Sequence, residues 1–222
     1  MLYVVGTPIG NLNDITLRAL ETLKSADVIA AEDTRHSGNL LRHFEIRKPL
    51  VSYHEHNEAM RTAELVERLA AGESVALITD AGMPGVSDPG ARLIRACIER
   101  GLEYTIIPGV SAVLTALVGS GFSLEQFCFL GFLPVKSGGR ERDLRAAAER
   151  EATSVFFESP YRINKTLAVC AEVMPERRLC VARELTKKFE EFRRGTAAEL
   201  LAHYTAHPAK GEITLVIEGH GG

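Results

Sequence analysis

The sequence predicts an α/β protein of two domains with largely parallel sheets. Short apolar runs rich in β-branched residues alternate with longer segments of helical periodicity along the whole chain. The 222 residues are enough for one large or two compact units of this kind. A segment rich in glycine and serine between Pro108 and Glu125 separates two series of strands. We therefore expect an N-terminal domain over residues 1–110 and a C-terminal domain over residues 111–222.

The strands and the clearest helices can be read directly from these patterns. Near-continuous apolar runs such as VALI are typical of strands covered on both faces. Helical stretches are expected over 58–71, 91–99 and 197–207. The expected strands cover residues 2–6, 28–32, 49–53, 74–79, 104–108, 126–131, 153–159, 178–183 and 212–219.

Composition excludes several classes of protein. A net charge of −3 and a hydrophobic content of 45% describe an ordinary globular chain, so a nucleic-acid partner needs a local basic patch. Residues 109–222 carry 15 Lys+Arg against 14 Asp+Glu, whereas residues 1–108 carry 11 against 15. The four cysteines form no CxxC pair, which argues against a zinc cluster and favours the reducing cytoplasm. Neither a signal peptide nor a membrane anchor is expected.

Glycine-containing loops follow the first, fourth and fifth strands, where open α/β sheets bind ligands. In the first, Gly6 and Gly10 precede a helix that we expect Thr16 to cap, with Ile15 and Leu20 as a hydrophobic staple. This loop lacks the G-x-G-x-x-G fingerprint, which argues against a dinucleotide site. The third, PGVSA, opens a helix at Ser111.

The second loop, TDAGMPGVSDPG, is longer than the roughly 2 to 6 residues that a plain connection needs. Gly82 and Gly85 would let the backbone approach a ligand, and Ser87 or Asp88 would cap the following helix. We expect this loop to contact a ligand through its backbone rather than through charges.

Motifs in consistent order then identify a family. GTPIGNL, AEDTR, HEHNE, TDAGMPGVSDPG, PGVSA, FFESPYR, RELTKKFEE with a following RG, and KGEITLVIEG cover essentially the whole chain. Together they resemble the ribosomal RNA small subunit methyltransferase I family of the tetrapyrrole methylase superfamily. The resemblance implies two α/β/α domains with a cofactor cleft between them, a homodimer, and S-adenosyl-L-methionine as cofactor. It also implies that the enzyme methylates the ribose 2′-hydroxyl of a cytidine in small-subunit (16S) ribosomal RNA. The binding partner would be that RNA or the small ribosomal subunit.

The resemblance also implies residue roles. The catalytic or substrate-contacting residues would be Asp33, Arg35, Glu184 and Lys187, from AEDTR and RELTKK. The cofactor-binding residues would be Ile9, Ala81, Gly82, Met83, Val86, Ser111, Ala112, Glu158, Leu185 and Ile213.

Methyl transfer needs an aligned acceptor and a way to remove its proton. We expect Asp33 to accept that proton, and Lys187, from the other domain, to stabilise negative charge or to act as a base if burial lowers its pKa. Both residues could instead belong to surface ion pairs. His54 and His56 could ligate a metal, but a polar loop is the favoured interpretation because no third ligand is evident.

Two other functions remain open. One is a sister enzyme that methylates a tetrapyrrole, although the first and second loops, GTPIGN and DAGMPG, favour RNA. The other is a non-catalytic RNA-binding assembly protein. We expect RNA to dock through Arg140 and Arg142 of KSGGRERDLR. If that stretch is only a flexible basic loop, RNA would dock elsewhere, such as around Arg193 and Arg194.

Overall fold

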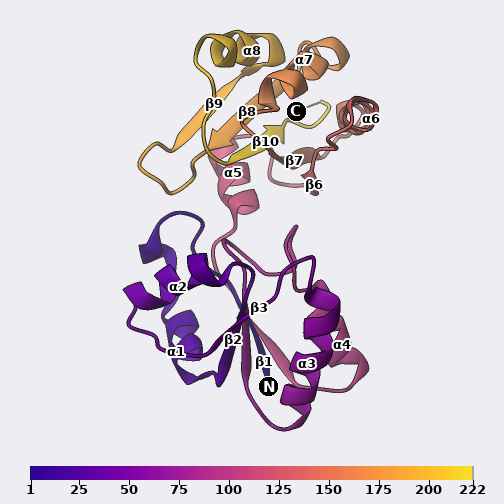
Figure 1. The fold of residues 1–222 in the computed structure, drawn as a ribbon. Helices are drawn as coiled ribbons and strands as arrows, with labels where there is room; N and C mark the ends of the chain where they lie inside the picture. The colour runs from indigo at the N-terminus through magenta and orange to yellow at the C-terminus, as the bar shows by residue number, and fades with distance from the viewer. Residues whose placement is uncertain (222) are drawn as a thin grey trace. The chain divides into compact units, whose positions relative to one another are not determined.

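The computed structural model describes residues 1–221, and these form two compact units (Figure 1). The first comprises Met1–Ser111 and the second begins at Ala112. Each unit contains a five-stranded sheet with helices against it. The prediction of two α/β domains is therefore confirmed.

The N-terminal unit has an all-parallel sheet of strand order β3-β2-β4-β1-β5. A 3-10 turn, Leu12–Asp14, precedes α1, which Thr16 caps as expected by accepting a hydrogen bond from the Ala19 N–H. The elements are β1 (Leu2–Val5), α1 (Leu17–Ser25), β2 (Val28–Ala31), α2 (Thr34–His43), β3 (Leu50–Ser52), α3 (Glu58–Ala70), β4 (Val75–Ile78), α4 (Ala91–Glu99) and β5 (Tyr104–Ile107).

The helices of this unit divide between the two faces of its sheet. Helices α1 and α2 cover one face, where Leu23 and Leu41 pack against Ile29 and Ile78 (Figure 1). Helices α3 and α4 cover the other face. The connections that leave β1 and β4, which are neighbours in the sheet, therefore run to opposite faces. Such a reversal opens a crevice at the carboxyl ends of the strands, where ligands of open α/β sheets bind.

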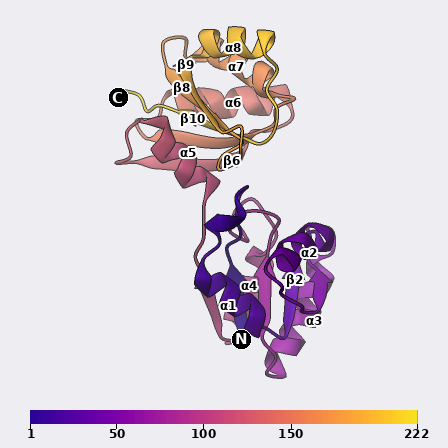
Figure 2. The same cartoon turned by 90° about the vertical axis from the view of Figure 1, so that its left-hand side faces the viewer.

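The C-terminal unit has a mixed sheet of order β6-β7-β10-β8-β9. Helices α6, α7 and α8 pack on one face and α5 on the other (Figure 2). Its elements are α5 (Ala112–Ser120), β6 (Phe127–Phe132), α6 (Ser137–Ala148), β7 (Thr153–Glu158), α7 (Ile163–Val173), β8 (Arg178–Arg183), β9 (Glu191–Thr196), α8 (Ala197–Ala206) and β10 (Ile213–Ile217).

The expectation of largely parallel sheets is wrong for this second unit. Only β6 and β7 pair in parallel, whereas β7, β10, β8 and β9 pair antiparallel. The charged strand β9 was not expected, because EFRRGT has no apolar run. An edge strand needs one covered face only, and exposed charges there discourage pairing with other chains. Strands β8 and β9 are joined directly by the loop over residues 184–190.

Candidate functional site

Three loops meet at the carboxyl edge of the N-terminal sheet, and their backbones touch. Gly6 follows β1, Met83 lies in the loop after β4, and Gly109 follows β5. A Cβ atom added to Gly6 would lie 2.6 Å from Met83 Sδ and 2.9 Å from Gly109 Cα. A Cβ atom added to Gly109 would lie 3.1 Å from Gly6 Cα. Only glycine allows so close an approach at these two positions.

A two-bond bridge joins the first loop to the second. The Thr7 N–H donates to the Gly82 carbonyl at 2.9 Å, and the Gly82 N–H donates to the Thr7 carbonyl at 3.1 Å. The Thr7 hydroxyl also donates to the Thr79 carbonyl at 3.2 Å. Gly82 has a φ of +76°, which a residue with a side chain adopts only with strain. Its backbone N–H and carbonyl thus hold the two loops together.

The other predicted cofactor-binding residues from these loops differ in exposure. Ile9 is nearly buried and lies beside Gly82, Ala81 and Met83 are partly exposed, and Val86 is exposed. Ser111 and Ala112 stand at the start of α5, as expected.

Helix α4 does not begin with the cap that the sequence predicts. Its N-cap residue is Gly90, with a φ of +143°, rather than Ser87 or Asp88. A Cβ atom at Gly90 would lie 3.0 Å from the Gly85 nitrogen, because the loop folds back on itself before the helix starts. Tight loop geometry thus overrides the usual preference for a polar cap.

An acidic latch, defined here as Glu32, Asp33 and Asp80, joins the ends of the neighbouring strands β2 and β4. The Asp80 N–H donates to Glu32 Oε2 at 3.4 Å, and the Asp33 N–H donates to Asp80 Oδ1 at 3.1 Å. Each strand end therefore supplies a backbone donor to a carboxylate of the other.

The two acids that follow β2 have opposite properties. Burial, together with the nearby charge of Asp80, raises the pKa of Glu32 above its ordinary value. Hydrogen bonds from the Arg35 side chain and backbone lower the pKa of Asp33 to about 2. Asp33 also caps α2, since its carboxylate accepts hydrogen bonds from the N–H groups of Arg35 and His36. Asp33 is thus a weak proton acceptor with a structural role, whereas Glu32 is the stronger base.

His54, which follows β3, lies close enough to act electrostatically on Glu32. The backbone N–H of His54 donates to Asn57 Oδ1 at 2.9 Å. Since that atom accepts, the other terminal atom of the Asn57 side chain, Nδ2, is the amide nitrogen. That nitrogen lies 3.1 Å from His54 Nε2. Nδ1 is buried and has no hydrogen-bond partner within residues 1–221.

The predicted site residues of the second unit gather at one end of its sheet. Ile213, at the start of β10, pairs with Glu158 at the end of β7 and with Arg183 at the end of β8. Leu185 follows β8 and is buried, as is the side chain of Ile213. Glu158 is 3% exposed and accepts hydrogen bonds from Ser159 and Thr166 while pairing with Arg162. This carboxylate is therefore fully engaged within its own unit.

Lys187 lies between two carboxylates. Its ammonium group is 3.0 Å from Glu184 Oε1 and 2.7 Å from Glu212 Oε2. Burial alone would lower the pKa of Lys187, but hydrogen bonds and charges of Glu212 and Glu184 raise it above its ordinary value. The expectation that burial turns Lys187 into a base is therefore wrong. Glu184 has a φ of +50°, and a Cβ atom at Gly211 would overlap its carboxylate, so this arrangement requires glycine there.

The basic residues expected to dock RNA are largely committed elsewhere. Arg140 is not in a flexible loop but in helix α6, where it is 6% exposed, so the expectation that it binds phosphate is wrong. Arg142 is exposed and pairs with Asp143. Arg193 pairs with Glu191, and the Arg194 guanidinium donates to the carbonyls of Gly119 and Ser120 at the end of α5.

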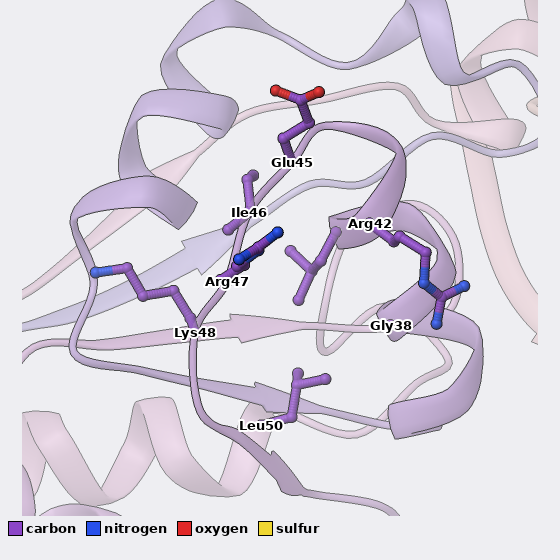
Figure 3. A pocket seen from close by; sticks show the side chains of 8 residues that line it. Gly38, Arg42, Glu45, Ile46, Arg47, Lys48 and Leu50 are labelled. Carbon is purple, nitrogen blue, oxygen red and sulfur yellow. The ribbon is translucent and has the colours of Figure 1, made fainter.

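A hollow in the N-terminal unit lies away from these loops. Figure 3 shows Arg42, Arg47 and Lys48 around an aliphatic base that includes Ile46 and Leu50. Helix α2 runs antiparallel to the strands, so its last turn and the start of β3 lie at the amino edge of the sheet. The glycine loops and the acidic latch lie at the opposite, carboxyl edge.

Comparison with protein families decides the assignment. The model of the tetrapyrrole (corrin/porphyrin) methylases matches residues 1–201. The chain belongs to this family. Similar curated proteins include the ribosomal RNA small subunit methyltransferases I of Synechocystis, Bacillus subtilis and Haemophilus influenzae, at 49%, 45% and 48% identity. Each alignment covers 99% of this chain and 79%, 75% and 78% of those proteins, respectively.

The resemblance predicted from the motifs is thus confirmed, and this tetrapyrrole methylase is a methyltransferase of the ribosomal RNA small subunit methyltransferase I group. Solved structures with the same fold include the methyltransferase CobJ, with a TM-score of 0.72 and 22% identity, covering 99% of this chain and 94% of that one. Uroporphyrin-III-C-methyltransferase from Thermus thermophilus gives a TM-score of 0.69 and 23% identity, covering 98% and 93%.

Within residues 1–221, no cluster of three or more His, Cys, Asp or Glu side chains is arranged to hold a metal ion. No helix in the same range has the length and apolarity to cross a membrane.

Replacing Gly6 with alanine tests the contact between the loops. The new methyl group would overlap Met83 and the Gly109 backbone, so we expect a loss of roughly 1–3 kcal/mol in the free energy of unfolding. Urea titration measures this loss. The matched control is Gly38→Ala in α2, where the nearest atom to the new methyl is 4.0 Å away and a gain of up to about 1 kcal/mol is expected. Equal stability of the two variants would contradict the geometry.

The protonation of Lys187 can be measured directly. NMR titration of its side chain should give a pKa above the ordinary value of 10.5. Changing Glu212 to glutamine should bring that pKa down, because one of the two stabilising carboxylates is removed. A wild-type pKa well below 10.5 would restore Lys187 as a candidate base.

Proposed function

We propose that this enzyme transfers the methyl group of S-adenosyl-L-methionine to the ribose 2′-hydroxyl of a cytidine in small-subunit ribosomal RNA. The observation that carries the proposal is the 45–49% identity to curated proteins named as methyltransferases of that RNA. The tetrapyrrole enzymes named above share the fold at 22–23% identity. The proposal takes the active form to be a homodimer and the reaction to occur in the cytoplasm.

The chemistry of the loops fits this cofactor. Residues 6–17, 79–91 and 108–120 contain no lysine or arginine, the side chains that usually accompany a bound phosphate. The loops instead offer three apolar residues, the nearly buried Ile9, the partly exposed Met83 and the exposed Val86, with the acidic latch alongside. A ligand with apolar parts, a positive sulfur and no phosphate matches these groups.

The backbone around Ala81 and Met83 would hold the methionine part of the cofactor, next to the Thr7–Gly82 bridge. Ser111 and Ala112 would contribute from the third loop. When bound, S-adenosylmethionine supplies a methyl group on a positively charged sulfur. The protein then has to align the acceptor oxygen with that methyl group and to remove its proton.

Glu32 is the residue we assign to proton removal. A ribose hydroxyl ionises too weakly near neutral pH to react unaided, so an acceptor is needed as the oxygen–carbon bond forms. The raised pKa of Glu32 makes its carboxylate a better acceptor than that of Asp33. Asp33 then acts as a positioning residue, because its N–H holds Asp80 beside Glu32.

The other predicted catalytic residues receive supporting roles. The side chain of Arg35 is 91% exposed and can reach a phosphate of the substrate. Glu184 and Lys187 order the loop between β8 and β9 through their ion pair. Their contribution to methyl transfer would be to hold that loop in one conformation.

Cofactor binding should need no metal. Isothermal calorimetry in the presence of EDTA should show S-adenosylmethionine binding to the wild-type protein. Ala81→Leu should weaken it by about tenfold or more, because the larger side chain costs at least ~1.4 kcal/mol at the binding surface. Ala71→Leu, at the exposed end of α3, is the control and should bind normally. Loss of binding in EDTA, or normal binding by Ala81→Leu, would reject this site.

The role of Glu32 predicts both a rate and a pH profile. Glu32→Gln should lower single-turnover methylation of undermethylated small subunits by roughly 10²–10⁴ at saturating cofactor. In the wild type the rate should fall as the pH drops through the raised pKa of Glu32, because protonation removes the acceptor. The variant should lose this dependence.

The control for that experiment is Glu45→Gln, at the exposed C-terminal side of α2. It should keep the wild-type rate and profile. A Glu32→Gln variant within threefold of the wild type, with an unchanged profile, would move the base elsewhere.

A further inference from the structure

Three aromatic residues of the C-terminal unit are unusually exposed. Tyr161 is 92% exposed, Phe189 67% and Phe132 58%. Within residues 1–221, no other phenylalanine or tyrosine is more than half exposed. Aromatic side chains gain free energy when they leave water, so such exposure commonly marks a binding surface.

The three aromatic residues lie at the same end of the C-terminal sheet. Phe132 pairs with Phe157 near the ends of the parallel strands β6 and β7, and Tyr161 follows β7 by three residues. The end of β7 is level with the end of β8, because Ile213 pairs with both Glu158 and Arg183. Phe189 lies in the loop that leaves β8, visible in orange beyond the sheet in Figure 1.

Three lysines at the same end have no ion-pair partner within residues 1–221. Lys136 follows β6, Lys188 precedes Phe189, and Lys210 precedes β10. Lys188 Nζ lies 5.6 Å from the centre of the Phe189 ring. The acids nearby are engaged: Glu158 pairs with Arg162, and Glu184 and Glu212 share Lys187. The lysines therefore remain available to an anionic partner.

Both the turn that carries Tyr161 and the loop that carries Phe189 are ordered by hydrogen bonds. The Thr186 N–H donates to Glu190 Oε2 at 2.6 Å, and the Glu190 N–H donates to the Lys187 carbonyl at 3.1 Å. Arg162 Nη1 donates to the Leu133 carbonyl at 3.0 Å, which ties the turn after β7 to the segment after β6. A backbone that is ordered in advance loses less conformational entropy when a ligand binds.

We propose that this aromatic rim, defined as Phe132, Tyr161 and Phe189 with Lys136, Lys188 and Lys210, binds single-stranded RNA. Unpaired bases stack on the rings while the lysines contact the phosphates, which is how proteins hold unpaired strands. Base-paired RNA would bind less well, because its bases are already stacked on one another. The inference rests on the proposed function, in that it takes the RNA substrate of that reaction as the ligand of this surface.

Binding of a fluorescein-labelled 12-nucleotide unstructured RNA to the full chain tests the rim. Fluorescence anisotropy should show that Tyr161→Ala and Phe189→Ala each weaken binding by roughly 5- to 100-fold, the range expected for loss of one stacked base. Their slopes of log affinity against log salt should stay unchanged. Lys188→Gln should instead reduce that slope by about 1, because one phosphate contact is lost.

The matched control is Phe127→Ala, since Phe127 starts β6 at the opposite end of the same sheet and is partly exposed. It should bind RNA like the wild type. A self-complementary duplex should compete poorly with the single strand. Equal affinity for the duplex, or undiminished binding by both Tyr161→Ala and Phe189→Ala, would overturn the proposal.

Calorimetry with S-adenosylmethionine and methylation of small subunits separate this proposal from the proposed function. The rim variants should bind the cofactor normally and should still show the cooperative thermal unfolding of a folded protein. If the wild type methylates subunits, and the rim variants bind RNA and methylate subunits equally well, the rim proposal is rejected and the proposed function stands. A wild type that binds cofactor but modifies no RNA would reject the function, whatever the rim does with the oligonucleotide.

Discussion

Backbone contact between the loops after β1, β4 and β5 is the constraint on which the candidate site depends. Gly6 and Gly109 touch without space for a Cβ atom, and Thr7 and Gly82 exchange two backbone hydrogen bonds. These contacts fix the ends of strands β1 and β4, from which the chain crosses to opposite faces of the sheet. Under the proposed function, the residues beside Gly82, Ala81 and Met83, would contact the cofactor, in positions that these loop contacts fix in advance.

The same sheet edge explains how adjacent acids acquire different chemistry. Consecutive residues at the end of a strand point in opposite directions. Glu32 turns toward Asp80 and loses water, which raises its pKa, whereas Asp33 turns toward the first turn of α2 and is held ionised by Arg35. One residue is thereby suited to accept a proton and the other to hold the helix. This division of roles is similar to that in other enzymes where environment separates two carboxyl groups.

Features that depend on local sequence were predictable. The glycine loops, the Thr16 cap and the helices α3, α4 and α8 all follow from turn residues, caps and periodicity close by in the chain. Features that depend on distant partners were not. Strand β9 is charged and gains its place only by pairing with β8, and Arg140 is buried only because α6 packs over the sheet.

The same limit applies to the site residues. The motif AEDTR could not show which acid faces Asp80, because that depends on the pairing of β2 with β4. The motif RELTKK could not show that Glu212 lies beside Lys187, 25 residues away in sequence. The exposure of Tyr161 and Phe189 also needed the structure, since FFESPYR and TKKFEE read equally well as buried or exposed aromatics.

The central claim is that the methyl group goes to a ribose oxygen of RNA. Labelled S-adenosylmethionine should be offered with undermethylated small ribosomal subunits and, in parallel, with uroporphyrinogen, and the RNA should then be digested with alkali. Because a 2′-O-methyl group blocks cleavage at its own nucleotide, the account predicts label in an alkali-resistant dinucleotide that begins with cytidine. Label in uroporphyrinogen, or in mononucleotides methylated on the base, would contradict it.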